Sequence, residues 1–153
     1  MNLLKNLRII FTVSAVAVAS VAFAEGDDPR HERHELMEDV RDAAKPVGEM
    51  FRGELEFDAE VVKTSLATWH SASLAFGDLF PEGTETGMNT EAAPAIWEDR
   101  AGFDAALTKW REAVEAAQAA APMTLEEAKP TVGPVFKTCK GCHDTYRIEE
   151  EEE

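Results

Sequence analysis

Residues 134–148 read PVFKTCKGCHDTYRI. This stretch predicts a helix, and it contains the motif Cys-Lys-Gly-Cys-His at residues 139–143. Residues three apart lie on the same face of a helix, so the thiols of Cys139 and Cys142 can reach one flat ligand together. The histidine that follows presents its imidazole beside the same ligand. The open face of that ligand then has to be closed by a different part of the chain.

The Cys-x-x-Cys-His spacing is the attachment signature of c-type haem. It predicts one covalent haem c, with thioether bonds from Cys139 and Cys142 and with His143 bound to its iron. A thioredoxin-like motif would need a βαβ context, and the sequence has no strand pattern. A zinc site would need a second pair of ligands, and none follows. A structural disulfide stays open as an alternative, but it leaves His143 without a role.

Upstream of this stretch, apolar residues recur at helical spacing. They predict three further helices, from about Pro29 to Phe51, from Asp58 to Leu79, and from Pro94 to Ala120. Asp58 is a good N-cap, and a proline such as Pro94 is favoured in the first turn of a helix. The stretch from Pro81 to Asn89 is rich in turn residues and forms the longest connection, which suits a crossover between two helix pairs.

Prolines complicate two of the predicted helices. Pro46 should kink the first helix or shift one of its turns, because its ring replaces an amide donor. Thr124 and Glu127 form a capping box, but Pro130 and Pro134 should interrupt the last helix, so that a clean helix begins only near Pro134. Four helices with short connections predict an all-α fold, an antiparallel four-helix bundle with one haem near the C-terminal helix.

The N-terminal residues 1–24 predict a cleaved secretory signal peptide. They begin with a basic segment that contains Lys5 and Arg8, continue with 13 to 15 apolar residues, and end in the small-x-small pattern Ala-Phe-Ala. A membrane anchor is the alternative, but a spanning helix needs about 20 apolar residues. We therefore expect a periplasmic protein with one domain over residues 25–148 and a disordered acidic tail over residues 149–153.

The charge of the chain restricts its partners. It has 153 residues, with 30 acidic against 15 basic side chains and a net charge of −15. A surface this acidic is repelled by phosphate backbones and anionic headgroups, which argues against nucleic-acid or membrane binding by the exported protein. The same charge predicts that a redox partner docks through a basic face and that the rates depend on salt.

The position of the motif near the C-terminus resembles that of class II cytochrome c, the cytochrome c-prime family. The resemblance covers the chain after the signal segment. It includes the residues around the motif and the loop Phe-Pro-Glu-Gly-Thr-Glu at 80–85. It also includes Pro-Ala-Ile-Trp at 94–97 and an arginine four residues before a methionine, Arg33 and Met37. The prolines at 46, 130 and 134 depart from the family pattern.

In this family, the residue that matches Met37 faces the iron from the side opposite His143. Two branches of the family then imply two functions. In the low-spin branch a methionine binds the iron and the protein is a one-electron carrier; the chain is closer to this branch in its second and third helices. In the high-spin branch the iron is five-coordinate and binds NO or CO after the distal side chain moves aside. Neither branch implies an enzyme with a substrate pocket.

The resemblance also implies further contacts with the haem. The residue matching Arg33 pairs with a haem propionate, and His34 matches a position that approaches the same propionate. Thr90 and Glu91 fall where the family places another propionate contact. Arg147 matches an arginine close to the proximal histidine. Family members often form dimers, so a homodimer stays open.

Overall fold

The computed structural model describes residues 28–148, so the predicted signal peptide and acidic tail lie outside the described residues. Within this range, the elements follow in the order α1 (Pro29–Arg52), α2 (Ala59–Ala75), the 3-10 helix η1 (Phe76–Leu79), α3 (Ala95–Glu98), α4 (Arg100–Ala120) and α5 (Leu125–Tyr146). The all-α fold is confirmed. None of these helices is both long enough and apolar enough to cross a bilayer.

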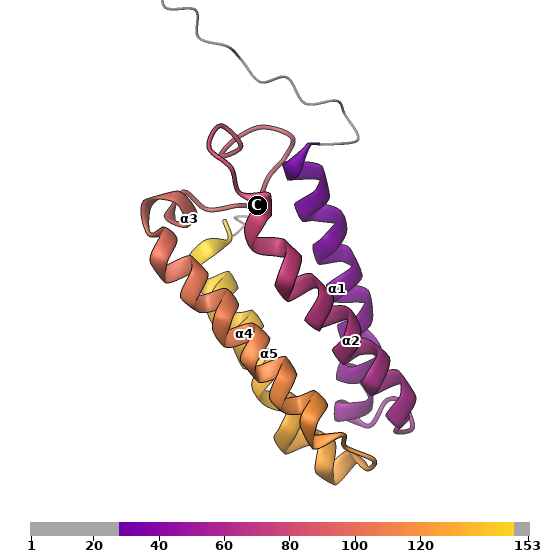
Figure 1. Ribbon diagram of the computed structural model, residues 1–153. Coiled ribbons are helices and arrows are strands. Elements are labelled where there is room, and N and C mark those ends of the chain that lie inside the picture. Colours follow the sequence, from indigo (N-terminus) through magenta and orange to yellow (C-terminus); the bar gives the residue numbers. More distant parts are fainter. Residues whose placement is uncertain (1–27, 149–153) are drawn as a thin grey trace, which may run out of the picture.

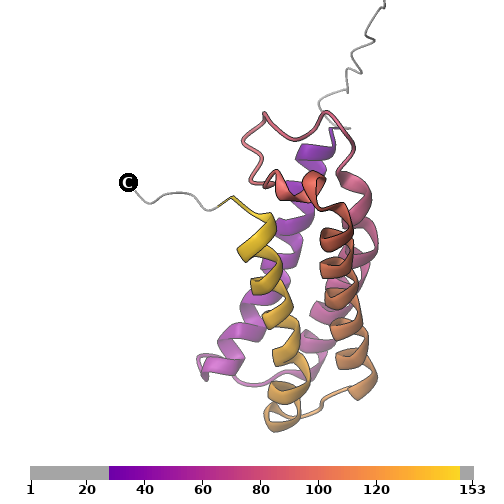
Figure 2. The same cartoon turned by 90° about the vertical axis from the view of Figure 1, so that its left-hand side faces the viewer.

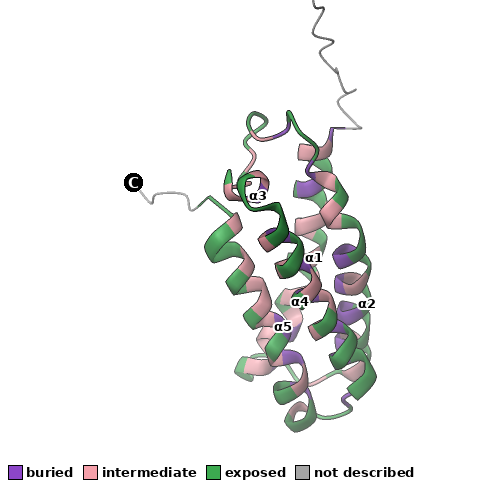
Figure 3. Ribbon diagram, turned by 60° about the vertical axis from the view of Figure 1, so that its left-hand side comes forward, coloured by how far each residue is buried: buried purple, intermediate pink, exposed green. Residues whose placement is uncertain are grey.

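The four long helices form an antiparallel bundle (Figures 1 and 2). Helix α1 packs on α2, α2 on α4 and α4 on α5, whereas α1 and α5 touch over few residues. The residues buried between the helices (Figure 3) are apolar residues of the periodic pattern from which the helices were predicted. They include Val47, Met50, Val62, Leu66, Trp69, Phe103, Leu107, Trp110 and Val114. One side of the bundle, between α1 and α5, is therefore less tightly closed than the other three.

The predicted caps form at the starts of two helices. The Asp58 carboxylate accepts hydrogen bonds from the backbone amides of Glu60 and Val61, at 2.9 and 3.2 Å, and begins α2. The Thr124 hydroxyl accepts a hydrogen bond from the Glu127 amide at 3.3 Å and begins α5. Each side chain replaces a backbone acceptor that the first turn of a helix lacks.

The expected interruption of the last helix is wrong, because α5 runs without a break through Pro130 and Pro134. Ala128, Val132 and Val135 on this segment are almost fully buried, so packing offsets the donors that the prolines remove. Gly133, directly before Pro134, favours this continuity. A residue before proline usually avoids helical backbone angles because its Cβ clashes with the proline ring, and glycine has no Cβ. Helix α1 also continues through Pro46 to Arg52, and the kink expected at this proline stays a prediction.

The third predicted helix is divided at Asp99 into α3 and α4. Asp99 takes a non-helical conformation, and its carboxylate accepts a hydrogen bond from the Gly102 amide at 3.0 Å. A Cβ at Gly102 would overlap that carboxylate and lie 2.6 Å from the hydroxyl of Tyr146 on α5. The break thus turns the chain where α4 begins to pack against the end of α5.

The loop between η1 and α3 is tied to the end of α5. The Ala93 amide donates to the carbonyl of Tyr146 at 3.0 Å, and the Ile148 amide donates to the carbonyl of Glu91 at 2.7 Å. Ala92 and Arg147 form an isolated antiparallel bridge between these two hydrogen bonds. The loop is therefore held above the open side of the bundle, next to the Cys-x-x-Cys-His motif.

The tight packing at Gly102 predicts a difference between two glycine substitutions. Gly102→Ala should destabilise the protein by about 1–3 kcal/mol, because the new methyl group has to displace Asp99 or Tyr146. Gly141→Ala, on an exposed face of α5 with no atom within 4 Å of the new Cβ, should be neutral or stabilising by up to about 1 kcal/mol. Guanidinium unfolding of the haem-loaded protein, followed by circular dichroism, measures both. Equal shifts in the two variants would contradict this account of the α3–α4 break.

Candidate functional site

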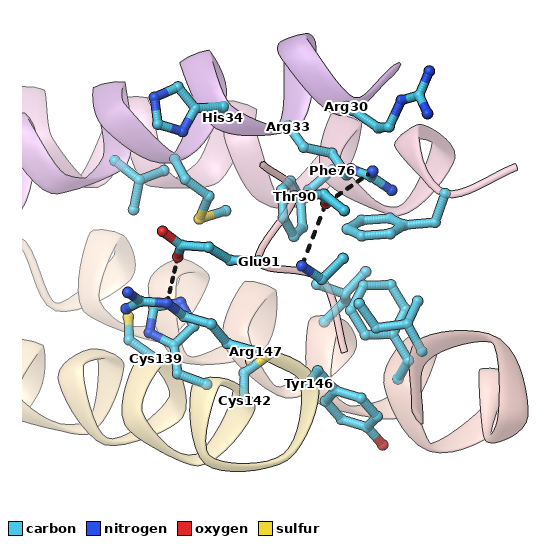
Figure 4. Close-up of a pocket in the computed structure, with 18 of the residues that line it drawn as sticks. Arg30, Arg33, His34, Phe76, Thr90, Glu91, Cys139, Cys142, Tyr146 and Arg147 are labelled. Atoms are coloured by element: carbon cyan, nitrogen blue, oxygen red, sulfur yellow. Dashed lines mark hydrogen bonds and ion pairs between the residues drawn. The ribbon is translucent and has the colours of Figure 1, made fainter. Parts of the chain in front are cut away.

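A cavity of about 430 Å³ opens between α1, α5 and the loop that precedes α3. Figure 4 shows α1 along one side of it and α5 along the other, with side chains from both helices pointing inward. Its volume falls in the range of small-molecule sites. The cavity occupies the side of the bundle that helix packing leaves open.

The α5 wall carries the Cys-x-x-Cys-His motif. Cys139 and Cys142 are free thiols and line the cavity together with His143. Burial raises the pKa of the Cys139 thiol to about 11 and also raises that of Cys142. Both sulfurs are therefore neutral thiols at pH 7. No disulfide joins them, which removes the support for the structural alternative.

His143 stands at the open edge of the cavity and is partly exposed to solvent. Partial burial lowers the pKa of its imidazole, and the Arg147 guanidinium lowers it further, against the opposing carboxylates of Glu91 and Asp144. The neutral imidazole, which is the form that binds metals, is therefore favoured.

The α1 wall faces the motif with a thioether and an imidazole. Met37 is half-buried against the core and lines the cavity, as does His34 one turn before it. His34 is largely exposed and lies 3.8 Å from Glu38. Among the other thioethers, Met88 lines the cavity from the loop, whereas Met50 is buried in the core and Met123 is 69% exposed.

Arg33 enters the cavity as a buried cation without an acidic partner. It is only 5% exposed and makes no ion pair with any residue of the described range. Its Nη2 donates to the Thr84 carbonyl at 2.9 Å and to the Thr90 hydroxyl at 3.2 Å. The guanidinium also lies over the rings of Phe80 and Trp97, 4.7 and 5.7 Å from their centres.

These contacts do not use all the hydrogen-bond donors of Arg33. Its Nε is buried without a hydrogen-bond partner. Desolvation, followed by the nearby charge of Arg30, lowers the pKa of Arg33 to about 10, so it remains cationic at pH 7. A buried cation of this kind favours a negatively charged ligand in the cavity beside it.

An ion pair crosses the rim of the cavity next to the motif. Arg147 Nε donates to a Glu91 carboxylate oxygen at 2.6 Å (Figure 4), and the Arg147 amide donates to the carbonyl of His143 at 3.2 Å. Thr90, the residue before Glu91, uses its hydroxyl to accept from Arg33 and from the Ala92 amide. The loop thereby connects the α1 wall to the α5 wall.

Apolar and aromatic side chains form the floor of the cavity. Phe80 and Phe103 pack edge to face with their centroids 4.9 Å apart, and Phe103 meets Tyr146 in the same way at 5.3 Å. Trp110 also lines the floor, and its indole nitrogen is buried without a hydrogen-bond partner. The floor is therefore suited to a large flat apolar group.

All the residues predicted from the sequence line this one cavity: Arg33, His34, Met37, Thr90, Glu91, Cys139, Cys142, His143 and Arg147. Thr84 also belongs to the site: it is 1% exposed and holds Arg33 through its carbonyl and hydroxyl. A lone threonine in a loop has no periodic pattern that could have revealed it. Phe80 was noted as part of a loop motif but not as a wall of the site.

The residues present fit a haem with acidic side groups. One helix supplies two neutral thiols a turn apart and an imidazole, the floor is apolar, and a buried guanidinium lacks an anion. Among residues 28–148, no group of three or more His, Cys, Asp and Glu side chains could hold a metal ion by itself.

Comparison with known proteins agrees with this fit. The family model for Cytochrome C' matches residues 28–147. Cytochrome c' of Rhodopseudomonas palustris is 37% identical over 145 residues, which are 93% of this chain and 97% of that protein. Cytochrome c-556 of Agrobacterium fabrum is 32% identical over 130 residues, 85% of this chain and 86% of the other.

A solved structure supports the same assignment. Cytochrome c' from Rhodopseudomonas palustris superposes with a TM-score of 0.78 at 36% identity, covering 81% of this chain and 98% of that one. The match extends over the whole bundle, so the fold and the motif agree with one family. The chain belongs to the cytochrome c' family and is a c-type cytochrome with covalently attached haem c.

Proposed function

We propose that the chain is a single-haem electron carrier in which His143 and Met37 bind the iron from opposite sides. The observation that carries this proposal is that the two residues belong to opposite walls of one cavity, His143 to α5 and Met37 to α1. An imidazole and a thioether are the axial pair of electron-carrying c-type cytochromes. When bound, the haem supplies an iron that takes up and releases one electron.

Cys139 and Cys142 hold the haem through thioether bonds, each formed by addition of a thiol across a vinyl double bond. Their position one turn apart on α5 would hold the ring beside the floor of Phe80, Phe103 and Tyr146. Both cysteines are free, so neither sulfur is engaged in another bond. His143 follows directly on the same helix and would bind the iron of the attached haem.

Arg33 binds a haem propionate in this proposal. Its Nε is the buried donor without a partner, and a carboxylate matches the fork geometry of a guanidinium. Thr84 and Thr90 fix the direction of the guanidinium, so the propionate meets an oriented cation. His34, exposed on the same helix, lies at the outer edge of the cavity where it can contact the propionate from solvent.

Arg147 and Glu91 act on the proximal side. The Arg147 backbone amide donates to the His143 carbonyl, and the Arg147 side chain is held at the rim by Glu91. The pair restrains the end of α5 and therefore the direction of the imidazole. The Glu91 carbonyl also accepts a hydrogen bond from the Ile148 amide, beside the bridge between Ala92 and Arg147, which makes this restraint part of the fold.

The names of the relatives are compatible with an electron carrier. The chain is similar both to proteins named cytochrome c' and to one named cytochrome c-556. Met37 is the feature that favours the carrier, because a thioether on the distal side leaves no open position for a gas. We further infer that residues 1–24 direct export and that the protein works in the periplasm, where c-type haem is attached.

The ligand assignment predicts the spectra of two methionine variants. The wild-type ferric protein should be six-coordinate and low-spin, and its ferrous form should resist CO. Met37→Leu should convert the iron to a high-spin five-coordinate form that binds CO, because leucine fills the same space without a donor. Met88→Leu, the matched control from the same cavity, should keep the wild-type spectra. Absorption and EPR spectra of the purified proteins distinguish these states.

A wild-type protein that is high-spin and binds CO would contradict the assignment of Met37 as an iron ligand. The methionine would then be a gate, and the gas-binding branch of the family would describe the protein better. If Met88→Leu loses the low-spin state instead, the distal ligand is Met88 of the loop.

The role of Arg33 predicts a change in reduction potential. Arg33→Gln should lower the potential by about 50 mV, because the buried cation no longer offsets the propionate charge that stabilises the ferric state. Arg33→Lys keeps the charge and should recover most of the difference. Potentiometric titration at pH 7 measures all three proteins. Equal potentials in the wild type and Arg33→Gln would show that the guanidinium does not pair with the haem.

A further inference from the structure

Two methionines of the described range are exposed to solvent. Met88 is 51% exposed and Met123 69%, whereas Met50 is 2% exposed and Met37 is half-buried. Of the exposed pair, only Met88 lines the haem cavity. Met123 lies between α4 and α5, and that turn is at the opposite end of the bundle from the loop before α3 (Figure 1). The Met88 side chain therefore stands at the boundary between the cavity and solvent.

The backbone at Met88 is strained. Gly87, Met88 and Asn89 have φ angles of 88°, 48° and 52°, all in the left-handed region. Glycine has no Cβ, and asparagine adopts this conformation more readily than most residues. Methionine rarely does, because its Cβ comes close to a carbonyl oxygen. Such strain costs free energy and persists only where neighbouring contacts enforce it, which makes it a pointer to function.

Contacts with α1 hold the chain on both sides of this strained turn. Arg30 Nη1 donates to the Thr86 carbonyl at 2.7 Å, and the Asp28 carboxylate fixes Arg30 by accepting from Nε at 2.9 Å and from Nη2 at 2.6 Å. On the other side, Arg33 Nη2 donates to the Thr90 hydroxyl at 3.2 Å. The left-handed residues are therefore confined between two points that are bonded to α1.

The side chain that this turn holds at the cavity is both apolar and oxidisable. The reduction potential of a haem depends on its exposure to solvent, because water stabilises the more highly charged ferric state. An apolar side chain at the opening keeps water from the haem. A thioether can lose this property, since oxidation converts it into a polar sulfoxide. Methionine at position 88 therefore differs from leucine, which would cover the opening but could not be oxidised.

We propose that Met88 is a site of reversible oxidation that controls how far water reaches the haem. Hydrogen peroxide transfers one oxygen atom to the thioether: the O–O bond breaks, an S–O bond forms, the sulfur loses two electrons and the peroxide is reduced to water. Methionine sulfoxide reductases reverse the step with thiols, which become a disulfide. The polar sulfoxide no longer shields the opening, so the ferric state is favoured. The proposal requires the attached haem but not the binding of iron by Met37.

The experiment treats the ferric holoprotein with hydrogen peroxide and identifies the oxidised methionines by mass spectrometry of its peptides. The same sample is then equilibrated in a redox buffer of fixed potential, and the ratio of ferrous to ferric haem is read from the absorption spectrum. Three variants accompany the wild type. Met88→Leu keeps an apolar side chain that cannot be oxidised, Met88→Gln supplies a polar one of similar length, and Met123→Leu removes the exposed methionine outside the cavity.

The two exposed methionines, Met88 and Met123, should be oxidised about tenfold faster than Met37, because their side chains meet the peroxide directly. Oxidation of the wild type and of Met123→Leu should lower the ratio of ferrous to ferric haem about threefold at the fixed potential. Met88→Leu should keep its ratio after the same treatment, and untreated Met88→Gln should resemble the oxidised wild type. Methionine sulfoxide reductases with a thiol should restore the ratio of the oxidised wild type.

An equal fall of the ratio in the wild type and in Met88→Leu would overturn the proposal. So would an unchanged ratio in a wild-type sample whose Met88 is fully oxidised, or oxidation of Met37 as fast as that of Met88. The absorption spectra keep this test apart from the carrier function. A high-spin wild type contradicts the binding of iron by Met37, yet the ratio still reports on Met88; a low-spin protein whose ratio does not respond loses only the role of Met88.

Discussion

Burying a cation costs several kcal/mol unless nearby groups compensate it, and Arg33 is buried with no carboxylate partner in the described chain. Hydrogen bonds from Arg33 to Thr84 and Thr90 and two aromatic faces offset part of this cost. Because both threonines belong to the loop before α3, the cation also fixes that loop on α1. The rest of the site follows from this contact, since the same loop carries Glu91 and is bonded to the end of α5. An anion in the cavity completes the coordination of Arg33 and so stabilises loop and ligand together.

Aromatic packing decides where the bundle is open. Phe136 contacts Phe51 and Trp69, at centroid distances of 6.0 and 5.6 Å, and closes the α1–α5 side at the end near the α1–α2 turn. Toward the other end, Phe80 of the loop packs on Phe103 of α4 and on Trp97 of α3, so neither ring by itself spans from α1 to α5. The cavity forms where the bridging ring is missing, and the Cys-x-x-Cys-His motif begins one turn beyond Phe136. The position of one phenylalanine therefore separates the closed part of the core from the site.

The helices and the site residues could be predicted because each leaves a local or family-level pattern in the sequence. Periodicity revealed the buried faces, and the spacing of Cys139, Cys142 and His143 revealed the motif helix. The continuity of α5 could not be predicted, because the burial of Val132 and Val135 that offsets the prolines depends on distant helices. The break at Asp99 was missed for a similar reason: it is fixed by close contacts between Gly102 and α5. Thr84 acts through tertiary contacts alone, which no spacing encodes.

Helix α1 can serve several roles because positions four residues apart advance by about 40° around its axis. Arg33 is buried in the interior, Met37 is half-buried on the cavity wall, and Arg41 is exposed on the surface. One regular spacing thus carries the chain from the interior, through the cavity, to the surface. A change in the register of α1 would displace all three positions at once. Pro46 lies beyond all three positions, toward the C-terminal end of α1. The backbone N–H that a proline lacks is therefore not one of the donors that hold the segment from Arg33 to Arg41 in its helix.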